Sequence, residues 1–142
     1  MQFERHAKSN AGFEETVDIV RELISEAGFG VISEIDVSGN ILQSMGEVYR
    51  PYLILGACIP EHAARGLEAR PDLGVLLPCN VAIHVEGDDV IVSAMEPREM
   101  LAMLGDAVVD DLAEDVGSRL EELINDIPAR TTPNNVGEDS ED

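Results

Sequence analysis

Two stretches of the chain carry apolar residues at the three- and four-residue spacing of an amphipathic helix. In the first, the apolar positions are Phe13, Val17, Val20, Ile24 and Ala27. Ser9 or Asn10 offers an N-cap for it, and Gly28 stands at the C-cap position. In the second, apolar residues recur every four positions over residues 104–124. This pattern predicts a long C-terminal helix, which Pro128 is expected to end.

Other stretches have the pattern of strands. Residues 2–6 predict a short strand, and Phe29, Val31 and Ile35 alternate through a second that ends near Asp36. The apolar run at residues 52–59 has two apolar faces, which is typical of a central strand covered on both sides.

A hairpin follows later in the chain. Residues 81–86 alternate between apolar and other side chains, and Gly87-Asp88-Asp89 then predicts a tight turn into residues 90–95. Two short segments complete the pattern: Pro60 to Ala69 predicts a helix with proline in its first turn, and Ser38 to Asn40 predicts a turn. Residues 41–48 are ambiguous, with a short helix capped by Asn40 as one reading.

The order of these elements predicts an α+β fold. One strand and one helix are followed by four strands, with a small helix inserted, and by the long C-terminal helix. We expect an antiparallel sheet with helices on one face, in the order β-α-β4-α. The chain has 142 residues, which is enough for one domain, placed at residues 1–127, and residues 128–142 are expected to form a disordered acidic tail.

The charge is unusual for a globular protein. Aspartate and glutamate number 29 against nine lysines and arginines, so the formal net charge is -20, and Lys8 is the only lysine. Molar salt shortens the screening length to about 3 Å and suppresses the mutual repulsion of such a surface. The composition therefore favours a halophilic protein. The alternative, an ordinary protein with an acidic tail, fits less well, because residues 128–142 carry a net charge of only -3.

Composition also limits the location and the partners. The N-terminus has no apolar signal region, and no run of eighteen uncharged apolar residues occurs, so we expect a soluble, cytoplasmic protein without membrane contact. Two cysteines in such a compartment are expected to be free thiols. Only 4% of residues are aromatic, which leaves little to stack on nucleobases.

The candidate chemistry centres on Cys58, His62 and Cys79. Cys58 lies where an apolar strand meets a helix N-terminus, a position that stabilises a thiolate and lowers the thiol pKa, and His62 follows one turn later. If the strands form an antiparallel meander, the three residues meet at one end of the sheet, where they suit zinc, copper or thiol redox chemistry. The alternative is that both cysteines are buried core thiols.

Several separated motifs resemble those of the domain of unknown function 302 family. They are Phe13-Glu14-Glu15, Gly28-Phe29-Gly30-Val31, Glu34-Ile35-Asp36-Val37, Leu55-Gly56-Ala57-Cys58-Ile59-Pro60 with Ala63, and Leu77-Pro78-Cys79-Asn80. The resemblance spans about residues 2–127 and is to an acidic, haloarchaeal type of member. It implies a TATA-binding-protein-like β-α-β4-α fold, a homodimer and no established activity. That fold name does not imply DNA binding, because so acidic a surface lacks a cationic patch for phosphates.

Three functions remain open. The favoured one is a module that binds a small ligand or metal ion, or senses it, through Cys58, His62 and Cys79. The second is a homodimeric structural or interaction protein whose apolar second sheet face is the dimer interface. A cysteine-dependent enzyme is the least favoured, because no phosphate loop, nucleophile elbow or H-E-x-x-H motif occurs. Glu34 and Asp36 share a strand face, but such a pair is expected by chance here, and His84 is expected to be exposed or at a dimer contact.

Overall fold

The computed structural model describes residues 2–133. The strands are β1 (Glu4–Ser9), β2 (Gly30–Asp36), β3 (Tyr52–Cys58), β4 (Cys79–Glu86) and β5 (Asp89–Met95). The α-helices are α1 (Phe13–Glu26), α2 (Val37–Met45), α3 (Pro60–Ala69), α4 (Pro97–Met100) and α5 (Ala107–Arg130). Two 3-10 helices, Pro71–Leu76 and Ala102–Leu104, follow α3 and α4.

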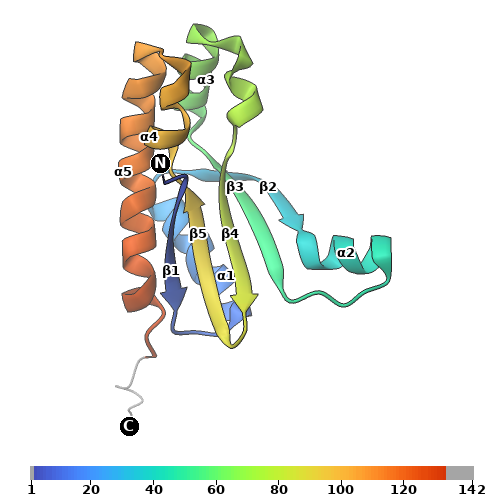
Figure 1. Ribbon diagram of the computed structural model, residues 1–142. Helices are drawn as coiled ribbons and strands as arrows, with labels where there is room; N and C mark the ends of the chain where they lie inside the picture. Colours follow the sequence, from blue (N-terminus) through green and yellow to red (C-terminus); the bar gives the residue numbers. More distant parts are fainter. Residues whose placement is uncertain (1, 134–142) are drawn as a thin grey trace.

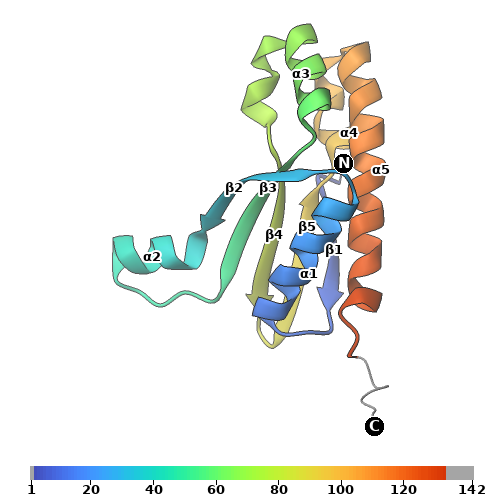
Figure 2. The same ribbon diagram turned by 180° about the vertical axis from the view of Figure 1, so that it is seen from behind.

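The five strands form one antiparallel sheet in the order β1-β5-β4-β3-β2. Helices α1 and α5 pack together on one face of the sheet, while α3 and α4 lie beyond one end of it (Figures 1 and 2). This confirms the predicted α+β fold and its β-α-β4-α order. Helix α4 is an addition that the apolar pattern did not predict, and α2 lies in the region where the pattern was ambiguous.

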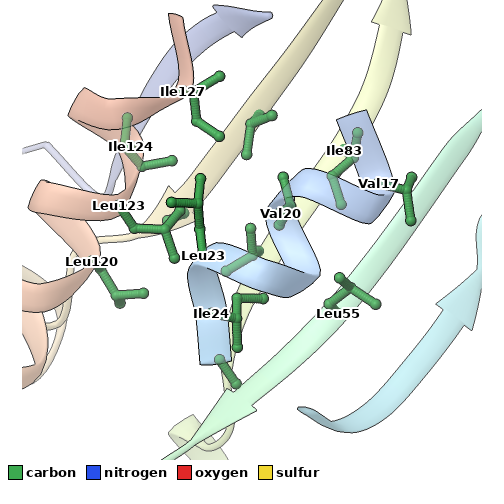
Figure 3. Packing of buried hydrophobic residues seen from close by; sticks show 14 of the residues in the cluster. Val17, Val20, Leu23, Ile24, Leu55, Ile83, Leu120, Leu123, Ile124 and Ile127 are labelled. Atoms are coloured by element: carbon green, nitrogen blue, oxygen red, sulfur yellow. The ribbon is translucent and has the colours of Figure 1, made fainter. Parts of the chain in front are cut away.

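The core lies between the sheet and the two long helices. Leu55, Val81, Ile83 and Val92 project from the three inner strands and are fully buried. The apolar stripes of α1 and α5 cover them, and Figure 3 shows these side chains meeting over the sheet. Because the core is built from aliphatic residues on one face of each element, the helical and strand periodicities of the sequence were sufficient to predict it.

Strand β3 is an interior strand of the sheet, as predicted, but the prediction that both of its faces are covered was wrong. The sheet order makes β4 the central strand, and β3 is the neighbour of the edge strand β2. The second face of β3 is half-buried at Tyr52 and Ile54, and both long helices lie on the opposite side of the sheet. On this open face the ring of Tyr52 stacks on His84, with the ring centres 4.8 Å apart. His84 is therefore half-buried by a neighbour in its own sheet.

The start of α1 also differs from the prediction. Gly12 is the N-cap residue, whereas Ser9 is the last residue of β1. The hydroxyl of Ser9 is buried and lies 2.6 Å from the hydroxyl of Thr16. This contact satisfies two polar groups inside the core, so Ser9 is not available to cap the helix. At the other end, Ala27 is the C-cap and Gly28 follows with a φ of 92°.

The predicted turn at residues 38–40 is instead the first turn of α2. The carboxylate of Asp36 accepts a hydrogen bond from the Gly39 amide at 3.0 Å and another from the Ser38 hydroxyl at 2.9 Å. Asp36 is therefore the N-cap in place of Asn40, and the helix begins four residues earlier than predicted.

Pro128 does not end α5. The helix continues to Arg130, and Thr131 is buried, with its hydroxyl accepting a hydrogen bond from the Asn10 amide at 2.8 Å. The side-chain amide of Asn10 also donates to the Pro128 carbonyl. The domain therefore extends past the boundary predicted at residue 127, and residues 134–142 of the predicted tail lie outside the described residues. In the part that is described, no helix is both long and apolar enough to cross a membrane.

Candidate functional site

A small apolar cavity lies at the end of the sheet, between β3, β4, α3 and α5, and its volume is about 50 Å³. Fifteen residues line it, and the only three that are not simple hydrophobic residues are Cys58, His62 and Cys79. The apolar lining consists of Phe29, Ala57, Ile59, Ala63, Leu73, Leu77, Pro97, Leu101, Val109, Leu112, Ala113 and Val116. All three residues singled out from the sequence thus line one cavity.

Strand register explains why the two cysteines meet. Strands β3 and β4 are antiparallel, and Ala57 pairs directly with Cys79. Cys58 is the next residue of β3, so both cysteines lie at the same end of the sheet, as predicted. Pro60 then begins α3 at that end, which places His62 in the first turn of the helix above the sheet.

The electrostatics of the two thiols differ from the prediction. Burial raises the pKa of Cys58, and the expected lowering by the α3 N-terminus does not prevail. Burial, with a smaller contribution from the charge of Cys58, raises the pKa of Cys79 to about 12. Both groups are therefore neutral thiols near pH 7, because burial disfavours the charged form.

His62 is held by a residue that sequence reasoning did not single out. Its Nε2 atom lies 2.7 Å from Oδ2 of Asp115 on α5. The same carboxylate oxygen accepts a hydrogen bond from Nε of Arg119 at 3.0 Å. The hydrogen bond from His62, together with Arg119, lowers the pKa of Asp115 despite the opposing effect of burial. The imidazole orientation is thus fixed by a carboxylate that lies 53 positions away in the chain.

Helix α3 packs closely over the cavity because Gly66 has no side chain. A Cβ atom at this position would lie 2.6 Å from Cδ2 of Leu73, which is a cavity residue. On the other side, Arg119 donates to the Ala27 carbonyl at the end of α1 at 2.6 Å. This hydrogen bond joins the end of α1 to α5.

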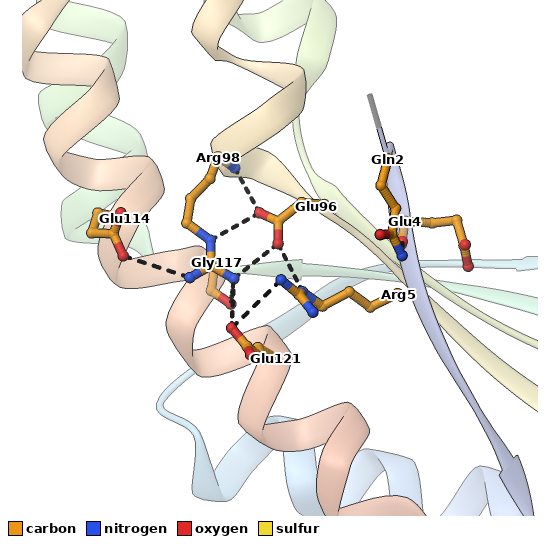
Figure 4. A network of polar contacts seen from close by, with 8 residues as sticks. All are labelled: Gln2, Glu4, Arg5, Glu96, Arg98, Glu114, Gly117 and Glu121. Carbon is orange, nitrogen blue, oxygen red and sulfur yellow. Dashed lines mark hydrogen bonds and ion pairs between the residues drawn. The ribbon is translucent and has the colours of Figure 1, made fainter.

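A second polar group borders the cavity at Pro97. Glu96, which precedes it, is buried, and its carboxylate accepts hydrogen bonds from Arg5 Nε at 2.8 Å and from the backbone N–H of Arg98 at 2.9 Å (Figure 4). The Arg98 guanidinium also donates to Glu96, to the Gly117 carbonyl and to Glu121. Strands β1 and β5 are thereby joined to α5. No sequence motif indicated this network, since its members are separated by up to 116 positions.

The metal hypothesis gains no support from this geometry. Over residues 2–133, no group of three or more His, Cys, Asp or Glu side chains is arranged to hold a metal ion. Cys58, His62 and Cys79 share a cavity, but His62 is hydrogen-bonded through Nε2 to Asp115. The arrangement suits binding of a small neutral molecule, with thiols and an imidazole as its polar contacts.

The other candidates have local roles. Glu34 binds Arg21 at 2.7 Å, and Asp36 caps α2, so this pair of carboxylates is already occupied. Nδ1 of His84 lies 3.5 Å from the Glu86 carboxylate, and the ring stacks on Tyr52.

We expect Cys58 to react faster than Cys79 with iodoacetamide. The Cys79→Ser variant retains Cys58, which is partly exposed, whereas Cys58→Ser retains Cys79, which is buried and has a pKa of about 12. At pH 8, alkylation of Cys79 should be at least about tenfold slower, because so little thiolate is present. Mass spectrometry against time and pH measures both rates. Equal rates, or faster alkylation of Cys79, would contradict the buried position of that thiol.

Comparison with known proteins supports the fold. The family model described as "Domain of unknown function DUF302" matches residues 5–127. No curated protein matches the chain. Among solved structures, the crystal structure of an uncharacterized conserved protein DUF302 from Bacillus stearothermophilus is similar, with a TM-score of 0.80 and 26% sequence identity. The match covers 93% of this chain and all of that one.

Proposed function

This chain belongs to the DUF302 family, and we propose that within this family it serves as a small-ligand-binding or sensor module whose site is the cavity at Cys58, His62 and Cys79. The observation that carries the proposal is the convergence of these three residues on a single apolar cavity. Pockets that combine an apolar lining with a few polar groups are the usual form of small-molecule sites.

The cavity size limits the ligand. One water molecule needs roughly 10 to 15 Å³ of such a volume, so a cavity of about 50 Å³ accepts a molecule of roughly three or four heavy atoms. Nucleotides and sugars are too large. The lining favours an apolar body, and the thiols and imidazole provide soft or polar contacts at one side. A nucleic acid partner is disfavoured by the net charge of -20.

Binding is favoured over catalysis by the state of the thiols. A nucleophilic cysteine requires a substantial thiolate population, and burial raises the pKa of both cysteines. His62 and Asp115 form a base and an orienting carboxylate, but among the described residues no hydrogen bond joins His62 to either thiol. The site therefore lacks an activated nucleophile.

Xenon is a suitable probe because it occupies small apolar cavities. We expect saturable xenon-induced shifts of the Leu112 and Ala113 methyl resonances in the wild-type protein. Ala63→Leu should abolish them, because Ala63 lines the cavity and the added atoms fill it. Ala64→Leu is the matched control, since this neighbouring α3 residue is exposed and outside the lining. Absence of saturable shifts in the wild type, or equal shifts in Ala63→Leu, would contradict the proposal.

A second candidate function is protein interaction through a projecting segment. Strand β2 forms one edge of the sheet, and helix α2 projects beyond that edge. Together they expose large apolar residues that include Leu42 and Met45. Exposed apolar patches of this kind commonly mark interaction sites.

The proposed setting is a salt-rich cytoplasm, as expected for an acidic protein of haloarchaeal type. Eight of the nine lysines and arginines have a carboxylate within 4.0 Å. Even so, the acids of the sequence outnumber the bases by 20, and in residues 2–133 the ion pairs with lysine or arginine involve only ten carboxylates. A high concentration of salt would screen their repulsion.

A further inference from the structure

We infer that residues 30–48, called the arm, form a self-association surface that packs against the arm of a second copy of the chain. The arm consists of β2, α2 and the following three residues. This inference rests on the second candidate function, the interaction role, and names the partner. It differs from the sequence expectation, which placed a dimer interface on the open face of the sheet.

The arm has no core of its own. Every residue of β2 is exposed, and no residue of α2 is buried. Figure 2 shows α2 projecting beyond the edge of the sheet, where its neighbour is the start of β3. An isolated helix of nine residues is too short to be stable in water, because most helical stability in proteins comes from packing of an apolar face. Pairing of β2 with β3 holds the arm to the sheet, but the apolar side of α2 is left uncovered in the single chain.

The apolar residues of the arm are suited to such a contact. Leu42 and Met45 are three positions apart on α2 and share one side of the helix. Met45 is 64% exposed, and Val48 beyond it is 89% exposed. Ile32 and Ile35 of β2 are also exposed. A group of large apolar side chains is thus carried outside the domain.

The low charge of the arm, on a chain that is otherwise strongly acidic, favours a second copy as the partner. Two chains that each carry a net charge of -20 repel one another, so they can meet only where the surface is poor in charge. Residues 37–48 contain a single ionisable residue, Glu47. In β2, Glu34 is paired with Arg21 and Asp36 caps α2. A basic partner would be attracted to the acidic helices, whereas this neutral surface matches another copy of itself.

The strand edge does not supply the contact. The pairing of β2 with β3 shifts register between Val31 and Ser33, so a bulge at Ile32 interrupts the edge. Bulges of this kind hinder strand addition. We therefore place the contact in the side chains of α2 and β2, related by a two-fold axis, with the same patch on both copies. The arm has nineteen residues, close to the roughly 20 to 30 per side of an average interface.

Light scattering coupled to size exclusion in 2 M KCl tests the inference. We expect a wild-type dimer, and Met45→Glu or Val48→Glu should raise its dissociation constant by about 30-fold or more. Val75→Glu is the matched control, because Val75 is 86% exposed, lies outside the arm and undergoes the same substitution as Val48. It should leave the dimer unchanged.

Other outcomes overturn the inference in distinguishable ways. A dimer that resists the arm substitutions but dissociates in Ile54→Glu would place the interface on the open sheet face. A wild-type monomer would overturn self-association. In that case the dye ANS, which binds exposed apolar surface, separates self-association from the broader interaction role. If ANS binds the wild type and Met45→Glu removes this binding, the arm remains a surface for a different protein. If ANS does not bind, the interaction role is rejected as well.

Discussion

Glu96→Gln is expected to destabilise the domain by about 3 to 5 kcal/mol, the usual effect of removing one partner from a buried ion pair. The Glu96 side chain is only 4% exposed, and both of its oxygens accept hydrogen bonds from arginines. The amide that replaces it is neutral, and one of its two polar atoms is a donor that faces donors. The guanidiniums of Arg5 and Arg98 would then lack their shared acceptor.

The expected fall in melting temperature is about 10 °C or more for a chain of this size. Glu114→Gln is the matched control, because Glu114 also contacts Arg98, at 3.5 Å, but is 72% exposed. It makes the same change of charge and should alter stability little. A similar effect of both substitutions would show that the buried network is not a principal source of stability.

The same residue predicts a pH dependence. Burial opposes ionisation of Glu96, but hydrogen bonds from Arg98 and Arg5 outweigh it and lower the pKa from 4.5 to about 2. A lowered folded-state pKa means that the stabilisation is complete above about 4.5 and is lost as the pH falls towards 2. The difference in unfolding free energy between wild type and Glu96→Gln should therefore narrow over this range. A constant difference from pH 6 to pH 2.5 would contradict the assignment.

The local pattern of apolar and polar residues was sufficient to predict the helices and strands that pack on the core. Helices α1 and α3 and the β4–β5 hairpin have clear periodicity, and Gly87 adopts the positive φ of 60° that the tight turn requires. Helix α2 has no such signal, because none of its side chains face a core and the periodicity of burial is absent. The end of α5 was predicted wrongly at Pro128, because hydrogen bonds from Asn10 and Thr131 to the Pro128 carbonyl support the last turn of the helix.

The candidate site was predicted in part. An antiparallel meander places Cys58 and Cys79 at the same end of the sheet whatever the side-chain packing, so their proximity followed from topology alone. Asp115 could not be identified, because it is one of seven acids in α5 and only the packing of α3 selects it. The direction of the Cys58 pKa shift was wrong because burial depends on the surrounding side chains, which sequence position does not reveal.

Raising the salt concentration from 0.1 to 2 M KCl is expected to increase the melting temperature by about 10 °C, or roughly 2 to 3 kcal/mol for a chain of this size. Two electrostatic effects oppose each other. Salt weakens the ion pairs, but those at the surface, such as Lys8 with Asp89, contribute little individually. Salt also screens the repulsion among acids that exceed the bases by 20, and this second effect is the larger because it acts over the whole surface.

A charge-reduced variant separates screening from general salt effects. Asp110→Asn, Asp111→Asn and Glu122→Gln neutralise three exposed positions on the solvated side of α5. If repulsion limits stability, this variant should melt at a higher temperature than the wild type in 0.1 M KCl, and its melting temperature should rise less with salt. Preferential exclusion of salt would instead raise the melting temperature of both proteins equally. Identical wild-type midpoints at 0.1 and 2 M KCl would reject the halophilic interpretation.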